Sequence, residues 1–171
     1  MPSKFSITEI LLDQVRTLRD LRTKRASKFD IFLNLVFPGI ISIIFIWCNR
    51  LILGAMINPI LTAFSVFAAL LLNMMVLIYT IVIRENSKDE TSGKDKLKLS
   101  LLAQTYTNIQ FAVLVSVFII ICLLLILFLP YNIYIESALS FLIYYFIFVF
   151  IFTMFMVLKR THIIMKREII P

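Results

Sequence analysis

The stretch IQFAVLVSVFIIICLLLILFL, Ile109–Leu129, contains no Asp, Glu, Lys or Arg. It is about as long as the ~20 apolar residues that cross a bilayer core as a helix. Backbone groups in lipid must form hydrogen bonds within their own segment, and a helix satisfies that requirement. The alternating polar and apolar pattern of a membrane β-barrel strand is missing. The stretch therefore predicts a membrane-spanning helix.

Three other uncharged apolar stretches accompany it, and they cover residues 31–48, 60–83 and 138–158. Apolar residues make up 61% of the chain and charged residues 16%, whereas soluble domains average about 45–50% and 25%. The predicted fold class is all-α, an integral membrane four-helix bundle with an N-terminal cytoplasmic amphipathic helix. Its parts are an arm (residues 1–30), the membrane domain (31–158) with a cytoplasmic loop (84–100), and a basic tail (159–171).

The distribution of basic residues predicts the orientation of the four spans. Of the 17 Lys and Arg residues, only Arg50 lies in a connection on the side opposite to the termini and the middle loop. Cytoplasmic segments carry the excess of Lys and Arg, so both termini and the middle loop are expected in the cytoplasm. Trp47, Tyr131 and Tyr134 fall at the expected outer interface, where aromatic residues gather. The expected location is therefore a bacterial inner membrane, with multiple spans and short outer connections.

The sequence of the N-terminal arm predicts an amphipathic helix from about Ile7 to Lys28. Its start, SITE at Ser6–Glu9, fits a capping box, and apolar residues recur at spacings of three and four. Three interpretations stay open: the arm lies on anionic lipid headgroups, it bundles with other copies or the middle loop, or it docks a soluble partner. Direct nucleic-acid binding is not expected. The candidate partner-binding residues are Ile7, Leu11, Val15, Leu18, Arg16, Arg19 and Arg22.

The middle loop, RENSKDETSGKDKLK, is polar and nearly balanced in charge, which is typical of a solvated, mobile connection. An alternative is that the third helix starts near Lys96 and protrudes into the cytoplasm. In the first span, Pro38 and Gly39 predict a bend near the inner end, because proline removes a backbone hydrogen bond.

Small and polar residues gather along single faces of the predicted spans. Such residues are what membrane helices bury against one another. These faces form either packing seams between helices or, in an oligomer, the lining of a pore. The candidate oligomer or pore seam consists of Thr62, Ser65, Ala69 and Asn73 of the second span, with Gln104 and Asn108 at the inner end of the third.

Catalytic and metal-binding patterns are missing from the sequence. No span contains an ionisable Asp, Glu, Lys or Arg, although proton-coupled pumps usually need a buried carboxylate. Cys48 and Cys122 form no CxxC pair, and His162 is the single histidine, so no nucleophile–base set is apparent. The sequence predicts a protein that is not an enzyme and binds no cofactor or metal.

The layout resembles the small four-span membrane subunit of the Kiwa anti-phage defence system. The resemblance rests on chain size, on the basic arm leading into KFDIFLNLVFPG at Lys28–Gly39, on the cytoplasmic ends and on the bare outer face. It covers the whole chain, but no catalytic or ligand motif accompanies it. The resemblance implies a homo-oligomer, with a tetramer expected, that carries a soluble DNA-binding partner on its cytoplasmic face.

The expected function is that of a non-enzymatic membrane scaffold or sensor subunit that recruits a soluble cytoplasmic partner in antiviral defence. A second hypothesis is a homo-oligomeric pore that permeabilises the membrane. The lack of charged rings argues against a selective channel. A third is an accessory protein whose arm binds anionic headgroups without a stable protein partner.

Overall fold

The computed structural model describes residues 36–48, 52, 54–86, 93–129 and 133–169, and its secondary structure is helical. The four helices are α3 (Phe37–Trp47), α4 (Gly54–Asn86), α5 (Gly93–Phe128) and α6 (Ile133–Ile169). Among the described residues no strand occurs. The all-α prediction is confirmed for this part of the chain.

Three of the helices are long and apolar enough to cross a membrane, over Gly54–Arg84, Leu99–Phe128 and Tyr134–Ile163. They contain the predicted second, third and fourth spans. The described part of the predicted first span is α3, which has 11 residues and is shorter than a full crossing. Residues 31–35 of that span lie outside the described part of the chain.

The long helices extend well past the apolar stretches that predicted them. At 1.5 Å per residue, α5 with its 36 residues and α6 with its 37 are each about 55 Å long, against a ~30 Å hydrocarbon core. α5 starts at Gly93, close to the predicted alternative start at Lys96, and α6 continues through the predicted tail to Ile169. The middle loop is therefore shorter than expected, because helix continues into polar sequence from both sides.

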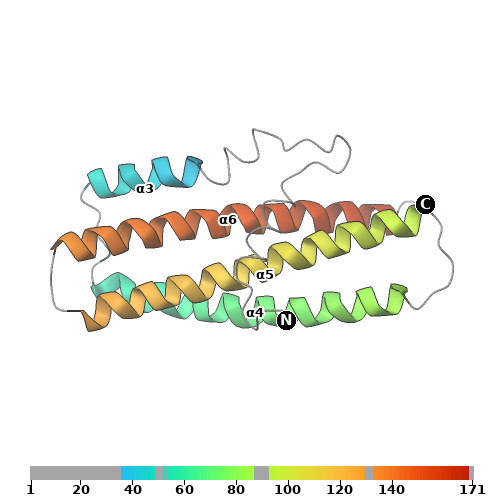
Figure 1. Ribbon diagram of the computed structural model, residues 1–171, viewed down its shortest axis with the longest axis horizontal. Helices are drawn as coiled ribbons and strands as arrows, with labels where there is room; N and C mark the ends of the chain where they lie inside the picture. The colour runs from blue at the N-terminus through green and yellow to red at the C-terminus, as the bar shows by residue number, and fades with distance from the viewer. Residues whose placement is uncertain (1–35, 49–51, 53, 87–92, 130–132, 170–171) are drawn as a thin grey trace, which may run out of the picture.

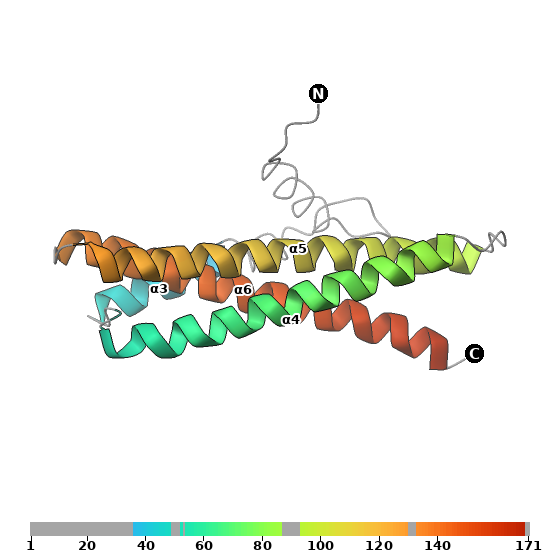
Figure 2. The ribbon, with the colours of Figure 1, turned by 90° about the horizontal axis from the view of Figure 1, so that it is seen from below.

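The helices lie in an open row in the order α3, α6, α5, α4 (Figures 1 and 2). Neighbouring backbones approach closely in the pairs α3–α6, α6–α5 and α5–α4, and within the described chain no such pair joins α3 to α4. Among the described helices, the bundle is therefore open between α3 and α4. α3 instead packs through aromatic rings on α6, with Phe37 on Phe152 at 5.6 Å between ring centroids and Phe45 on Tyr144 at 5.1 Å.

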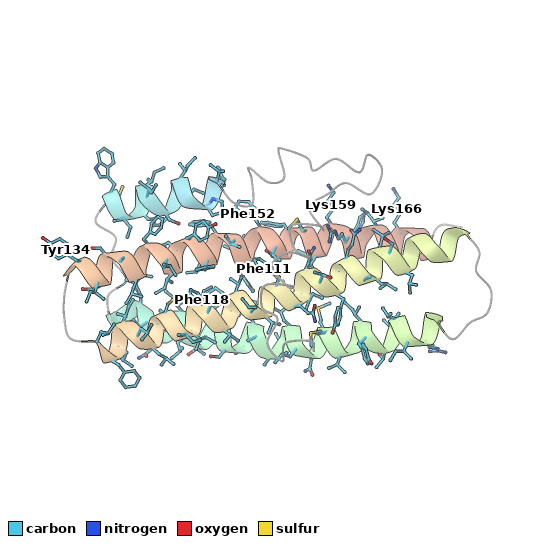
Figure 3. The ribbon with its side chains drawn as sticks, viewed as in Figure 1. Phe111, Phe118, Tyr134, Phe152, Lys159 and Lys166 are labelled. Atoms are coloured by element: carbon cyan, nitrogen blue, oxygen red, sulfur yellow. The ribbon has the colours of Figure 1, made fainter. Side chains whose placement is uncertain are left out.

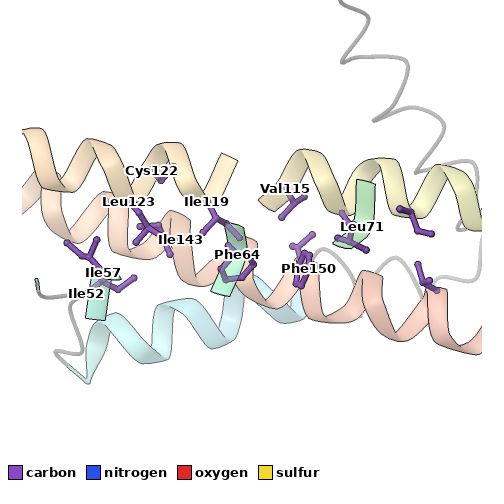
Figure 4. Packing of buried hydrophobic residues seen from close by; sticks show 14 of the residues in the cluster. Ile52, Ile57, Phe64, Leu71, Val115, Ile119, Cys122, Leu123, Ile143 and Phe150 are labelled. Carbon is purple, nitrogen blue, oxygen red and sulfur yellow. The ribbon is translucent and has the colours of Figure 1, made fainter. Parts of the chain in front are cut away.

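The core lies where α5 meets α4 and α6 (Figure 4). α5 contributes Ile119 and Leu123, both fully buried, and α4 contributes Phe64 and Leu71. Phe64 also reaches Phe150 of α6, with 5.2 Å between ring centroids, so side chains of α4 and α6 meet beside α5. α5 is therefore the central helix of the described structure.

The first turn of α3 contains Pro38, a position where its missing N–H costs no helical hydrogen bond. The Ser42 hydroxyl donates to the Pro38 carbonyl at 2.7 Å. Gly39 lies beside α6, where an added Cβ would stand 4.0 Å from a ring carbon of Tyr145. The predicted bend at Pro38 concerns residues before α3 as well, and these lie outside the described part of the chain.

Candidate functional site

The predicted polar stripe on α4 faces away from the core. Thr62, Ser65, Ala69 and Asn73 are all exposed, as is Thr80 further along the helix. The buried residues of α4 occupy the other side of the helix and include Ile57, Phe64, Ala68, Leu71 and Ile78. The stripe therefore has no helix of its own chain packed on it, among the helices described.

Most polar groups of the stripe are satisfied within α4. The Thr62 hydroxyl donates to the Asn58 carbonyl at 2.9 Å, and the Ser65 hydroxyl donates to the Leu61 carbonyl at 2.8 Å. Hydroxyls bonded in this way are well tolerated in apolar surroundings. The Asn73 amide is different, because two donors and one acceptor cannot all bond to their own helix. Asn73 is thus the residue of the stripe that most needs an outside partner.

The two candidate residues on α5 lie on the inner side of the fold. Asn108 is completely buried and Gln104 is half-buried. Sequence reasoning placed them with the α4 residues as one oligomer or pore seam, but the structure brings the two groups to different surfaces. Asn108 belongs to a seam inside the chain, together with the buried Thr105 and Ser116.

That inner seam includes residues that the sequence reasoning missed. Two of them, Thr105 and Ser116, lie on α5, and the third is Thr153 of α6; all three are buried. Each hydroxyl donates to the main-chain carbonyl four residues earlier in its own helix. Because these short side chains are satisfied locally, α5 and α6 can pack closely along them. On α5 the signal in the sequence was the spacing of Thr105, Asn108 and Ser116 by three and eight residues, which puts them on one face of a helix.

A cross-helix hydrogen bond joins α5 to α6 at the end of the apolar region. The partly buried guanidinium of Arg160 donates through Nη1 to the main-chain carbonyl of Gln104 at 3.1 Å. Hydrogen bonds from charged donors are stronger than neutral ones. At the other end of the fold, the Ile52 N–H donates to the Ser140 hydroxyl at 3.2 Å, which ties the α3–α4 connection to α6.

The basic residues around Arg160 point in two directions. Lys159, His162 and Lys166 are exposed, whereas Arg160 turns toward α5. Lys159 and Lys166 project from the same side of α6 (Figure 3). The predicted tail is therefore an extension of α6 that presents a basic face.

The predicted arm residues lie outside the described part of the chain. They are Ile7, Leu11, Val15, Arg16, Leu18, Arg19 and Arg22. Their role stays a prediction.

Reactive residues in the described part of the chain are few. Cys48 is exposed, Cys122 is buried and both are free. Within the described residues, no cluster of His, Cys, Asp and Glu is arranged to hold a metal ion.

No protein-family pattern, curated protein sequence or solved structure matches this chain. The placement of the chain's own residues is therefore what points to its function.

Proposed function

We propose that this chain is a non-enzymatic integral membrane protein that self-associates through α4 and acts as a scaffold or sensor subunit. The observation that supports this most directly is the outward stripe of Thr62, Ser65, Ala69 and Asn73. Lipid offers the Asn73 amide no hydrogen-bond partner, whereas the same stripe on a second copy does. Small side chains at Ser65 and Ala69, four residues apart, let two helix backbones approach closely.

The placement in the membrane follows from α6. Between Glu136 and Lys159 this helix carries no charged residue, and that stretch is about 33 Å long, close to the ~30 Å hydrocarbon core. Lys159 then marks the inner boundary. The bias of Lys and Arg supports a cytoplasmic position for this end, and the proposed location is a bacterial inner membrane with both termini inside.

The cytoplasmic platform is built from the ends of α5 and α6. The bond from Arg160 to Gln104 sets these two residues at one level, so Gly93–Ala103 and Lys159–Ile169 both project beyond it. Each projection is about 16 Å long at 1.5 Å per residue, and both lie at the same end of the molecule (Figure 2). We propose that these two helix ends, together with the arm, dock a soluble protein.

The partner is a soluble cytoplasmic protein. The resemblance to the Kiwa membrane subunit supports a DNA-binding partner, a tetrameric assembly and a role in anti-phage defence. In that role the membrane subunit responds at the envelope and holds its partner where foreign DNA enters.

Purification of the full chain through a C-terminal tag in mild detergent tests the scaffold. We expect a native complex whose mass corresponds to several copies of the chain with a stoichiometric soluble protein. Leu11→Asp with Leu18→Asp should remove the soluble protein, since it places charges on the apolar face of the arm, but should preserve the oligomer.

The matched control adds the same charges on the predicted polar face of the arm, as Thr23→Asp with Ser27→Asp. This control should keep the soluble protein. Equal retention of the soluble protein by both double variants would exclude the arm as its docking site. A complex without any soluble protein would contradict the scaffold.

The exposed stripe also supports the alternative function, a homo-oligomeric pore. In a pore the stripe lines a water-filled channel, whereas in a scaffold a helix of another copy covers it. Single cysteines at Thr62, Ala69 and Asn73 distinguish the two, in a chain from which the exposed Cys48 and the buried Cys122 have been removed. A pore predicts modification of the three positions by a charged, water-soluble thiol reagent, with Met74→Cys, exposed on another face, unreactive.

Protection of all three cysteines, at the level of the Met74→Cys control, would rule out a water-filled lumen along α4. The scaffold would then keep α4 as a closed packing interface.

A further inference from the structure

One face of α6 changes from apolar to basic within a single helical turn. Phe155 and Leu158 are 61% and 63% exposed, and Lys159, His162 and Lys166 are exposed beyond them. At 100° per residue these five residues occupy an arc of about 100°. Along one side of the helix, the face therefore changes from apolar side chains, which suit lipid tails, to Lys and His side chains.

Another side of α6 carries a cation, Arg160, that binds within the protein and does not belong to the basic face. Arg160 is about 100° from Lys159 around the helix, and its guanidinium is engaged with the Gln104 carbonyl of α5. Lys159 and Lys166 both point away from α5 (Figure 3). Lys159 and Lys166 thus lie on an outer surface of the described structure.

The position of the basic face along α6 matches the headgroup layer. Lys159 directly follows the uncharged stretch of α6 that is about as long as the hydrocarbon core. Lys166 lies about 10 Å further along the axis, and the headgroup layer of one leaflet is about 5–8 Å deep. Lysine side chains are long and flexible, so both ammonium groups can reach that layer.

Among the side chains that the structure describes, no acidic one lies near the basic face. The one acidic side chain in that described set is Glu136, at the opposite end of α6.

We infer that Lys159, His162 and Lys166 form a binding face for the phosphate groups of anionic lipids in the cytoplasmic leaflet. This inference rests on the proposed insertion of α6 in the membrane, but not on the recruitment of a soluble partner. The apolar residues Phe155 and Leu158 contact the acyl chains of the same lipids. The face holds the cytoplasmic end of α6 at the membrane surface and leaves the projecting end of α5 for other contacts.

The test uses the purified full chain in mild detergent, titrated with phosphatidylglycerol or with phosphatidylcholine of the same acyl chains. Native mass spectrometry counts the lipids that stay bound. We expect the wild-type chain to prefer phosphatidylglycerol. Lys159→Gln with Lys166→Gln should weaken phosphatidylglycerol binding about 30-fold at physiological salt, since each lysine near an anionic surface contributes about fivefold. Lys159→Arg with Lys166→Arg should bind as the wild type does.

The matched control removes two charges further from the boundary, as Lys94→Gln with Lys96→Gln in the first turn of α5. These positions lie about 12–15 Å beyond Gln104 along the axis, further from the headgroup layer than Lys159 and Lys166. Phosphatidylglycerol binding should be unchanged. A wild-type chain without preference for phosphatidylglycerol, or equal losses in the two glutamine double variants, would overturn the inference.

Two further measurements separate the possible causes of failure. Inorganic phosphate at the same concentration should not displace the lipid; if it does, the site is one for free phosphate and the inference is wrong. Retention of the chain in membranes after alkaline carbonate washing tests insertion by itself. Loss of insertion would overturn both the proposed function and the lipid site, whereas loss of lipid preference with insertion intact overturns only the lipid site.

Discussion

Replacing Ala69 with phenylalanine should convert the native complex of this protein into single copies. Ala69 lies in the middle of the outward stripe, about 140–160° around α4 from the buried residues Phe64 and Leu71. Because Ala69 is exposed in the single chain, a larger side chain there costs the fold little. Between two closely packed helices the same ring creates overpacking, which costs about 1–3 kcal/mol at each interface. Native mass spectrometry or light scattering in mild detergent measures the outcome.

Ala63→Phe provides the matched control for this change. Ala63 is also exposed on α4, but it lies about 120° around the helix from Ala69, so it faces lipid in the proposed assembly. The control should keep the oligomer. If both variants keep the mass of the wild-type complex, self-association through the stripe is excluded, and if both dissociate, the interface is wider than the stripe.

Replacing Ile119 with alanine should lower the free energy of unfolding by about 2 kcal/mol. Ile119 is fully buried in the middle of α5, between α4 and α6, so truncation leaves a cavity. In water such a change costs about 2–5 kcal/mol, part of which is the transfer of apolar surface out of water. In a membrane the separated helices are still in an apolar solvent, so mainly the cavity and lost contacts remain. Unfolding with SDS from mild detergent measures the difference.

Ile121→Ala makes the same chemical change two residues away, at a side chain that is 48% exposed. Its effect should stay within about 0.5 kcal/mol, because few contacts are lost at an exposed site. Comparable destabilisation by the two variants would show that α5 does not pack between α4 and α6 as described.

The three helices that are long and apolar enough to cross a membrane were predictable because hydrophobicity adds up along a continuous stretch of sequence. An uncharged apolar run such as Ile109–Leu129 is unfavourable in water and favourable in lipid over its whole length, whatever its neighbours are. Helix ends were less predictable: α5 starts at Gly93 and α6 continues to Ile169, in polar sequence where no change of solvent marks the boundary. The bond between Arg160 and Gln104 had no sequence signal, since the two residues are 56 positions apart.

The candidate seam shows that a sequence pattern does not predict which helix faces are buried inside the chain. Asn73 and Asn108 look alike in sequence, each on a helix face with small and polar neighbours. The structure exposes Asn73 and buries Asn108 completely. Only the order of the helices in the row assigns the first to an outer surface and the second to the inside of the chain.

By itself, the sequence determined that the chain is helical and apolar enough to cross a membrane, and that its basic residues gather at one end. These are properties of composition over about 20 residues, and they do not depend on distant contacts. The tertiary structure decided which polar stripe is left uncovered and which side of α6 carries its free lysines. In soluble proteins hydrophobicity separates inside from outside, but lipid is as apolar as a helix interface. For this reason the faces of α4, α5 and α6 could be assigned only once their partners were known.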